Sequence, residues 1–350
     1  MVRNILFAVP GDLATPTGGY AYDRRIIAEL AGMGWPVEVL DIGGEFPFPS
    51  AHARRLAGER LMAVPHDRIV IVDGLALGVL PDVAHTLCAR QSLVALVHHP
   101  LALETGLTAA EVDRLRASER AALAAARHVI VTSGETARRL AADYAVAADK
   151  ITVARPGNDP ATPARGSSDG IVRLLSVGAL VPRKGFDVLL AALERLADLP
   201  WRLTIAGDRT RDPPTAALID VMIARAGFED RISVVGAVPR ERLALLHDEA
   251  DLFVLASRFE GYGMAYAEAL AHGLPVIGTT AGAIPETVPA GCGILVPPGD
   301  PSALARALNL SIGDADRRRR MAKCAREAAS RLPRWQETAA TIARALERLA

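Results

Sequence analysis

The sequence predicts an α/β protein built from two Rossmann-like, doubly wound parallel-sheet domains that face a cleft. Three observations carry this prediction. Short apolar runs alternate with amphipathic stretches along the chain. The runs are apolar without alternation, which is typical of strands buried on both faces of a parallel sheet. The pattern pauses once and then restarts, and 350 residues are enough for two such domains.

The first half of the chain carries six candidate strands. They are Ile5–Val9, Val37–Asp41, Arg68–Val72, Leu93–Val97, His128–Thr132 and Ile151–Ala154. Amphipathic helices are expected at Tyr22–Gly32, Ala109–Ala126 and Glu135–Tyr144. This order of strands and helices indicates consecutive βαβ units.

The pause is the segment Asp159–Gly170, whose Pro, Gly and Ser content predicts a linker. The second set of expected strands is Val172–Val177, Arg202–Ala206, Ile232–Val235, Leu252–Leu255, Val276–Gly278 and Gly293–Val296. The second set of expected helices is Phe186–Leu196, Pro214–Ala226, Arg240–Asp248 and Tyr262–Ala271, with a helical tail broken near Gly313 and at Pro333. The predicted domains are therefore 1–160 and 161–330, followed by a C-terminal helix at 331–350.

The composition narrows the class of protein. The 40 Lys and Arg residues balance 40 Asp and Glu residues, which argues against nucleic acid as the main partner. Cys88, Cys292 and Cys324 are far apart and without a CxxC spacing, so neither a disulfide framework nor a zinc site is expected. The first apolar run is too short for a signal peptide, and no run approaches the length of a membrane helix. These features favour a cytoplasmic protein.

One motif, Ser257 to Leu270, directly follows a predicted strand. Its glycines, Gly261 and Gly263, allow close approach of the backbone to a ligand, and the amides from Gly261 to Met264, Tyr262 included, would open the next helix and attract a phosphate or a sugar hydroxyl. Glu260 and Glu268 stand eight positions apart. Eight residues rise about 12 Å along a helix, so the two carboxylates would bracket an extended ligand, such as a nucleotide sugar.

Three further candidates also follow predicted strands. The loop after Val172–Val177 begins at Gly178 and carries Arg183 and Lys184, two cations able to neutralise a leaving diphosphate. Lysine is rare in this chain, with three in all, which makes Lys184 stand out against a solvated basic pair. His98 and His99 close the strand Leu93–Val97 and point in different directions, so only one of them is expected to face the cleft, where it could donate to a substrate. A structural histidine is at least as good an interpretation of either residue taken alone. Gly18 and Gly19 form a tight turn after the first strand, without the full GxGxxG spacing.

Taken together, these residues resemble those of the GT-B glycosyltransferases of family 4, often called group 1. The resemblance is strongest from Leu174 to Asp300. The pair of glutamates with Gly-Tyr-Gly after the first, the Arg-Lys-Gly segment, and the later blocks Pro275–Gly278, Gly282–Glu286 and Gly293–Asp300 occur in the family's order. One departure is Ala179, which stands where the family often has an arginine.

The resemblance implies specific roles. Lys184 would bind the donor diphosphate with Arg183, Glu268 would hold the ribose, and Glu260 with the amides of Gly261, Tyr262, Gly263 and Met264 would contact the donor sugar and its phosphate. Gly18, Gly19 and Gly178 would approach the diphosphate, and His98 would touch the donor sugar near the reacting carbon. The resemblance further implies transfer with retention of configuration, no bound metal and no cofactor besides the donor substrate. It also implies that the N-terminal domain binds the acceptor and that the last helix crosses back to it.

The implied reaction moves a hexose from a UDP-, GDP- or ADP-linked donor to a glycan, a lipid-linked acceptor or a small molecule. Two alternatives stay open: a nucleotide-sugar 2-epimerase on the same architecture, and a weakly catalytic nucleotide-binding scaffold. The segment from Ile42 to His66 shows no signal for the acceptor. Arginines at 114, 116, 120 and 127 allow peripheral contact with a membrane at its inner face, although a solvated helix face is the more ordinary interpretation.

Overall fold

The computed structural model describes residues 4–349 of the chain. The chain divides into two compact units. Unit 1 comprises Met1–Gly157 and Pro333–Ala350, and unit 2 comprises Asn158–Leu332. The division lies three residues before the expected one, so the whole of Asp159–Gly170 belongs to unit 2. The helix after Pro333 belongs to unit 1.

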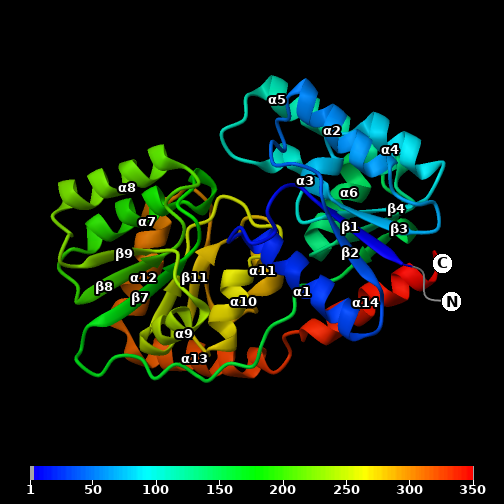
Figure 1. Cartoon of the computed structure of the whole chain (residues 1–350). Helices are drawn as coiled ribbons and strands as arrows, with labels where there is room; N and C mark the ends of the chain where they lie inside the picture. Colours follow the sequence, from blue (N-terminus) through cyan, green and yellow to red (C-terminus); the bar gives the residue numbers. More distant parts are fainter. Residues whose placement is uncertain (1–3, 350) are drawn as a thin grey trace. The chain divides into compact units, whose positions relative to one another are not determined.

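Unit 1 is built on a parallel sheet of six strands in the order β2-β1-β3-β4-β5-β6 (Figure 1). The strands are β1 (Ile5–Val9), β2 (Val37–Asp41), β3 (Ile69–Asp73), β4 (Ser92–Val97), β5 (His128–Val131) and β6 (Ile151–Val153). The residues of β1, β3, β4 and β5 are all buried, as a sheet covered on both faces requires.

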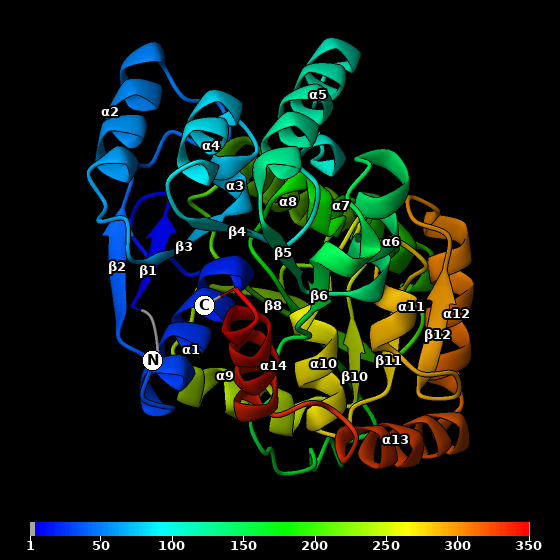
Figure 2. The same ribbon diagram turned by 90° about the vertical axis from the view of Figure 1, so that its right-hand side faces the viewer.

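The helices of unit 1 are α1 (Gly18–Gly32), α2 (Ala51–Met62), α3 (Gly74–Leu77), α4 (Pro81–Cys88), α5 (Ala109–Ala125), α6 (Gly134–Asp143) and α14 (Trp335–Glu347). Apolar side chains of α2, α4, α5 and α6 share one core with one face of the sheet. On α1, Thr17 caps the N-terminus by accepting the amide of Tyr20. Helices α1 and α14 lie side by side in both views (Figures 1 and 2).

Unit 2 repeats the plan with a parallel sheet in the order β12-β11-β10-β7-β8-β9. Its strands are β7 (Val172–Val177), β8 (Trp201–Ala206), β9 (Ile232–Gly236), β10 (Leu252–Val254), β11 (Val276–Thr279) and β12 (Gly293–Val296). Its helices are α7 (Phe186–Leu193), α8 (Pro213–Ala226), α9 (Arg240–Glu249), α10 (Met264–Ala271), α11 (Ile284–Thr287), α12 (Pro301–Gly313) and α13 (Ala315–Ala329). One continuous apolar core joins this sheet to its helices.

The predicted fold class is confirmed, and each predicted strand is found within one residue at either end. Helices α2 and α4 were not predicted. Helix α2 buries only Ala53, Ala57, Gly58 and Leu61, which is too few large apolar side chains to give a helical pattern. Among the described residues, no helix combines the length and the apolar character that crossing a membrane requires.

The expectation about cysteine is wrong for one pair. Cys292 and Cys324 form a disulfide whose Cα atoms lie 4.9 Å apart, although 32 positions separate them in the sequence. Cys292 precedes β12 and Cys324 lies on α13, so the pair is created by tertiary packing rather than by a local spacing. Cys88 is the free, exposed cysteine of the described chain.

Candidate functional site

The candidate site in unit 2 lies where β7 and β10 end. These two strands are neighbours in the parallel sheet, so the loops that follow them start from the same edge. The loop after β7 carries Arg183 and Lys184, and the loop after β10 carries Glu260. The backbone amide of Arg258 donates to the carbonyl of Arg183 over 2.8 Å, which fastens one loop to the other.

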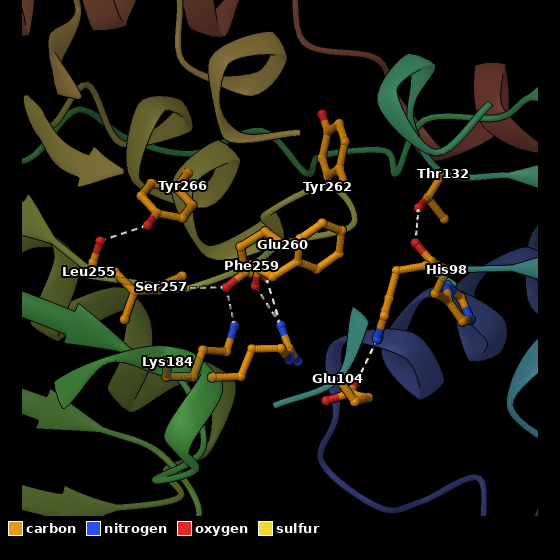
Figure 3. Close-up of polar contacts among 12 residues, drawn as sticks. His98, Glu104, Thr132, Lys184, Leu255, Ser257, Phe259, Glu260, Tyr262 and Tyr266 are labelled. Atoms are coloured by element: carbon orange, nitrogen blue, oxygen red, sulfur yellow. Dashed lines mark hydrogen bonds and ion pairs between the residues drawn. The ribbon is translucent and has the colours of Figure 1, made fainter. Parts of the chain in front are cut away.

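Glu260 is the centre of this site and is buried. Figure 3 shows Lys184 and Ser257 pointing at its carboxylate. Lys184 Nζ lies 2.6 Å from Oε1, and the hydroxyl of Ser257 donates to the same oxygen over 2.6 Å. Arg183 Nη1 donates to the carbonyl of Phe259 over 3.0 Å and lies 3.4 Å from Oε2 of Glu260. One carboxylate is therefore held by two cations and a hydroxyl.

The electrostatics of Glu260 follow from these contacts. Burial alone would raise the pKa of this carboxyl, but Lys184, then Arg183, and then the hydrogen bonds lower it to about 2. Glu260 is consequently ionised at every physiological pH. A charge of this kind is stable inside a protein only when it is paired and hydrogen-bonded, as it is here.

Two glycines allow the loops to meet. Gly185 has a φ of +67°, and a Cβ there would lie 2.0 Å from the carbonyl oxygen of Ala256. Gly282 has a φ of +58°, and a Cβ there would lie 2.2 Å from the carbonyl oxygen of Glu260. Both the left-handed conformation and the close contact exclude a side chain at these positions. Gly185 and Gly282 therefore allow the loops around Glu260 to pack closely against one another.

Helix α10 starts beside Glu260 without a side-chain cap. Its N-cap, Gly263, has a φ of +90° and offers no side-chain oxygen to the first amides of the helix. Uncapped amides at a helix N-terminus favour an anion. Glu268 lies on the same helix and is half-buried. Burial raises the pKa of Glu268 to about 7, against the opposing charges of Arg240 and Lys184.

Gly178 and Lys184 are also in contact. A Cβ on Gly178 would lie 3.2 Å from the Cδ and Cε atoms of Lys184, so the lysine stem lies across this glycine. Gly207 approaches Gly178 still more closely, because a Cβ on Gly207 would lie 1.7 Å from the carbonyl oxygen of Gly178. The departure at Ala179 thus lies next to a tightly packed turn. Arg183, four residues after Ala179, is directed at Glu260 and Phe259.

Unit 1 holds a second cluster of titratable groups. His98 follows β4, Asp73 ends β3, and Asp23 lies on α1. His98 Nε2 lies 3.1 Å from Asp23 Oδ1 and 3.7 Å from Asp73 Oδ2. The candidate ligand atoms of the three side chains all lie within 4.8 Å of one another. Two carboxylates and an imidazole could hold a divalent cation, so the absence of a metal stays a prediction.

The other predicted residues of unit 1 are placed as follows. A Cβ on Gly19 would lie 3.3 Å from the ring of His98, whereas Gly18 has open space around it. His99 turns to Glu104, with 2.5 Å between Nε2 and Oε1.

Asp23 and Asp73, the two carboxylates beside His98, were not predicted from the sequence. Asp73 had a usable signal, because it is a polar residue at the end of a buried strand, but the strand was predicted to stop one residue earlier.

Comparisons with known proteins give the same family for the second half. Residues 163–328 match the family described as Glycosyl transferases group 1. D-inositol 3-phosphate glycosyltransferase of Xylanimonas cellulosilytica is 32% identical over 241 residues, covering 64% of this chain and 57% of that protein. MMP alpha-(1->4)-mannosyltransferase of Mycolicibacterium hassiacum is 29% identical over 265 residues, covering 71% of this chain and 63% of that protein. The chain thus spans less than two thirds of the length of these relatives.

Solved structures show the same fold over the whole chain. A sucrose-phosphate synthase of Thermosynechococcus elongatus has a TM-score of 0.82 at 22% identity and covers 99% of both chains. HepE of Anabaena, solved in complex with UDP and glucose, has a TM-score of 0.76 at 20% identity and covers 99% of this chain and 100% of that one. At such identities the likeness shows the fold alone.

Proposed function

We propose that the chain is a group 1 glycosyltransferase, the family that its residues 163–328 match, and that it transfers a sugar from a nucleotide-diphosphate donor to an acceptor. The observation that carries the proposal is the arrangement at the end of β7 and β10. Lys184 and Arg183 are both held by one buried carboxylate, that of Glu260, which precedes the uncapped N-terminus of α10 by three residues. This combination suits a diphosphate whose negative charge grows as it leaves.

Each residue has a role in this proposal. Lys184 binds the diphosphate and Arg183 supports it, while the amides from Gly261 to Met264 receive phosphate oxygens. Glu260 orients the two cations and contacts the donor sugar. Glu268 accepts hydrogen bonds from the ribose hydroxyls. Hydrogen bonds donated to a carboxylate favour its ionised form. Binding of the ribose hydroxyls would therefore lower the pKa of Glu268 from its value of about 7.

The bond changes are those of a glycosyl transfer. The bond between the anomeric carbon and the diphosphate oxygen breaks, and the acceptor oxygen forms the new bond and loses its proton. We propose retention of configuration and no requirement for a metal, as the family resemblance implies. In that case, Lys184, Arg183 and the helix amides supply the positive charge that a metal would otherwise supply.

The donor base and the acceptor are left open. The names of two relatives mention an inositol 3-phosphate and the transfer of mannose, and one structural neighbour was solved with UDP. These names define a first panel of substrates. Peripheral contact with a membrane would extend that panel to lipid-linked acceptors.

A thermal-shift screen of UDP, GDP, ADP and their sugars, with and without EDTA, tests donor binding. A ligand that binds only the folded state raises the melting temperature. We expect one nucleotide series to do so, independently of EDTA, and Lys184→Ala and Glu268→Ala to lose the shift. Calorimetric titration below the melting temperature separates lost binding from lost stability.

Two exposed residues provide matched controls. Lys323 and Glu327 lie on α13 with side chains that are 76% and 61% exposed. Lys323→Ala and Glu327→Ala should keep the shift of the wild-type protein. If no nucleotide stabilises the protein at saturating concentrations, the proposed function is wrong.

A further inference from the structure

The inference concerns a pocket that lies wholly within unit 1. It is lined by residues 47–49 of the loop after β2, by the first turn of α2, by Val79 after α3, and by one face of α5. These segments follow β2, β3 and β4, and ligands of parallel α/β sheets bind outside the carboxyl ends of the strands. The pocket encloses about 160 Å³, which is room for several water molecules or one small polar group.

The apolar wall of this pocket is shared with the turn after β4. Val79 and Leu115 line the pocket and also pack with Leu101 in one small apolar cluster. Leu101 begins a turn three residues after His98, and its amide donates to Glu119 of α5 over 3.0 Å. A ligand in the pocket would therefore lie close to the loop that carries His98.

The charged side chains of the pocket are all positive. Two of its lining residues are arginines, Arg54 of α2 and Arg114 of α5, and none is acidic. Ser118, one turn after Arg114, adds a hydroxyl. A guanidinium presents its N–H groups as a planar fork that matches the oxygens of a phosphate or a carboxylate. The lining therefore favours an anion.

Both guanidinium groups keep donors for such an anion. Arg54 Nη1 donates to the carbonyl of Val79 over 2.6 Å, which holds the side chain at the pocket and uses one of its five N–H groups. Arg114 is exposed, and within residues 4–349 its guanidinium has no hydrogen-bond or ion-pair partner. The carboxylate of Glu111, one turn before Arg114, accepts the amide and the hydroxyl of Thr108 instead.

An aromatic ring completes the lining. Phe48 lies between Pro47 and Pro49, and 51% of it is exposed, although large apolar side chains are normally buried. Small-molecule sites combine apolar and aromatic walls with a few placed polar groups. The pocket thus fits a small organic molecule that carries an anionic group better than it fits a free ion.

We propose that this pocket binds the phosphate monoester group of an acceptor, with Arg54, Arg114 and Ser118 donating to the phosphate oxygens. A phosphate monoester carries a charge of about −1.5 to −2 at pH 7, which two guanidinium groups balance. A carboxylate would balance only one of them. The same molecule carries the hydroxyl that receives the sugar. This inference rests on the proposed function, because it names the class of acceptor that the transferase would use.

The first test measures binding without sugar transfer. Glycerol 3-phosphate, glucose 6-phosphate and D-inositol 3-phosphate are titrated calorimetrically into the full chain, each beside its unphosphorylated alcohol, with and without the nucleotide found in the thermal-shift screen. We expect a phosphate monoester to bind more tightly than its alcohol. Arg114→Gln should weaken that binding about 10- to 100-fold, the usual loss for a hydrogen bond between charged groups.

A second arm tests whether the phosphate belongs to a lipid. Vesicles of phosphatidylcholine, with and without phosphatidic acid, are sedimented with the wild type and with Arg114→Gln. Binding to phosphatidic acid that Arg114→Gln reduces by a similar factor would support the inference with a lipid as the acceptor. If no phosphate monoester binds in either arm while a nucleotide does bind, the inference is wrong and the proposed function stands.

Arg55→Gln is the matched control for both arms. Arg55 is the neighbour of Arg54 on α2, its side chain is 61% exposed and paired with Glu59, and it does not line the pocket. The variant removes the same charge from unit 1 and should leave binding unchanged. Equal losses in Arg114→Gln and Arg55→Gln would reveal general attraction to a basic surface and would overturn the inference. Ser118→Ala, which keeps every charge, should weaken binding by a smaller factor than Arg114→Gln.

The last test uses the donor that the thermal-shift screen identifies. Arg114→Gln should raise the KM of the phosphorylated acceptor about 10- to 100-fold and leave the KM of the donor unchanged. A raised donor KM with an unchanged acceptor KM would overturn the inference, while sugar transfer would stand. Phosphate binding that depends on Arg114, in a protein that binds no nucleotide, would support the pocket and contradict the proposed function.

Discussion

Unit 1 and unit 2 place buried carboxylates at the same edge of similar sheets but neutralise them differently. In unit 2, Glu260 has two cations and a hydroxyl, and its pKa falls to about 2. In unit 1, Asp23 and Asp73 share one imidazole, and the pKa of Asp73 rises to about 7. Burial acts in the same direction on both, so the number of cations for each carboxylate decides the outcome. Glu260 in unit 2 therefore stays ionised at neutral pH, whereas Asp73 in unit 1 takes up a proton near pH 7.

The largest effect is expected from removing the cation of unit 2. In Lys184→Met, Glu260 keeps the hydroxyl of Ser257 but loses its nearer cation, and Nη1 of Arg183 lies 3.4 Å away. Losing one partner of a buried ion pair lowers the free energy of unfolding by about 3–5 kcal/mol. Urea unfolding at pH 7, followed by circular dichroism, measures the loss.

The double variant Lys184→Met with Glu260→Gln is the informative control for that experiment. It removes the buried charge together with its partner, so most of the lost stability should return. Lys323→Met, at an exposed position, should change little. Equal losses in the single and double variants would show that the lysine stem, rather than the charge, stabilises the loop.

A smaller effect is expected at a buried carboxyl without a cation. Glu119 on α5 accepts the amide of Leu101 over 3.0 Å, and burial raises its pKa to about 8. A raised folded-state pKa means that stability is complete below about pH 4.5 and is lost as pH rises through about 8. Glu119→Gln keeps an acceptor for Leu101 and removes the titration.

We therefore expect Glu119→Gln to be more stable than the wild type above pH 8, by roughly 2–4 kcal/mol, and closer to it at pH 5. Melting temperatures of both proteins between pH 5 and 9 provide the measurement. Parallel curves across that range would mean that Glu119 is not protonated in the folded protein.

The smallest effect is expected at a pair exposed to solvent. Arg173 and Asp169 lie 2.7 Å apart with side chains 40% and 46% exposed. Such pairs contribute about 0–1 kcal/mol. Arg173→Ala should change the urea midpoint very little, and a loss as large as that in Lys184→Met would contradict the role given to burial.

The sequence predicted candidate site residues best where they directly follow a buried strand. Lys184, Glu260 and His98 were predicted because each comes after a buried strand, and the structure places them at sheet edges. Their roles toward a substrate are still predictions. Asp23 gave no signal, because its position on α1 acquires meaning only when β4 brings His98 beside it. The same holds for the bond between Cys292 and Cys324, which depends on how α13 packs.

The most direct test of the proposed sugar transfer follows one donor through a complete reaction. The nucleotide sugar that stabilises the protein is incubated with a panel of acceptors, and nucleoside diphosphate and glycoside are quantified by mass spectrometry. We predict equal amounts of both products, released only when an acceptor is present and reduced strongly in Glu268→Gln. A bound nucleotide sugar that stays intact with every acceptor, or that only changes configuration at C2, would contradict the assignment as a glycosyltransferase.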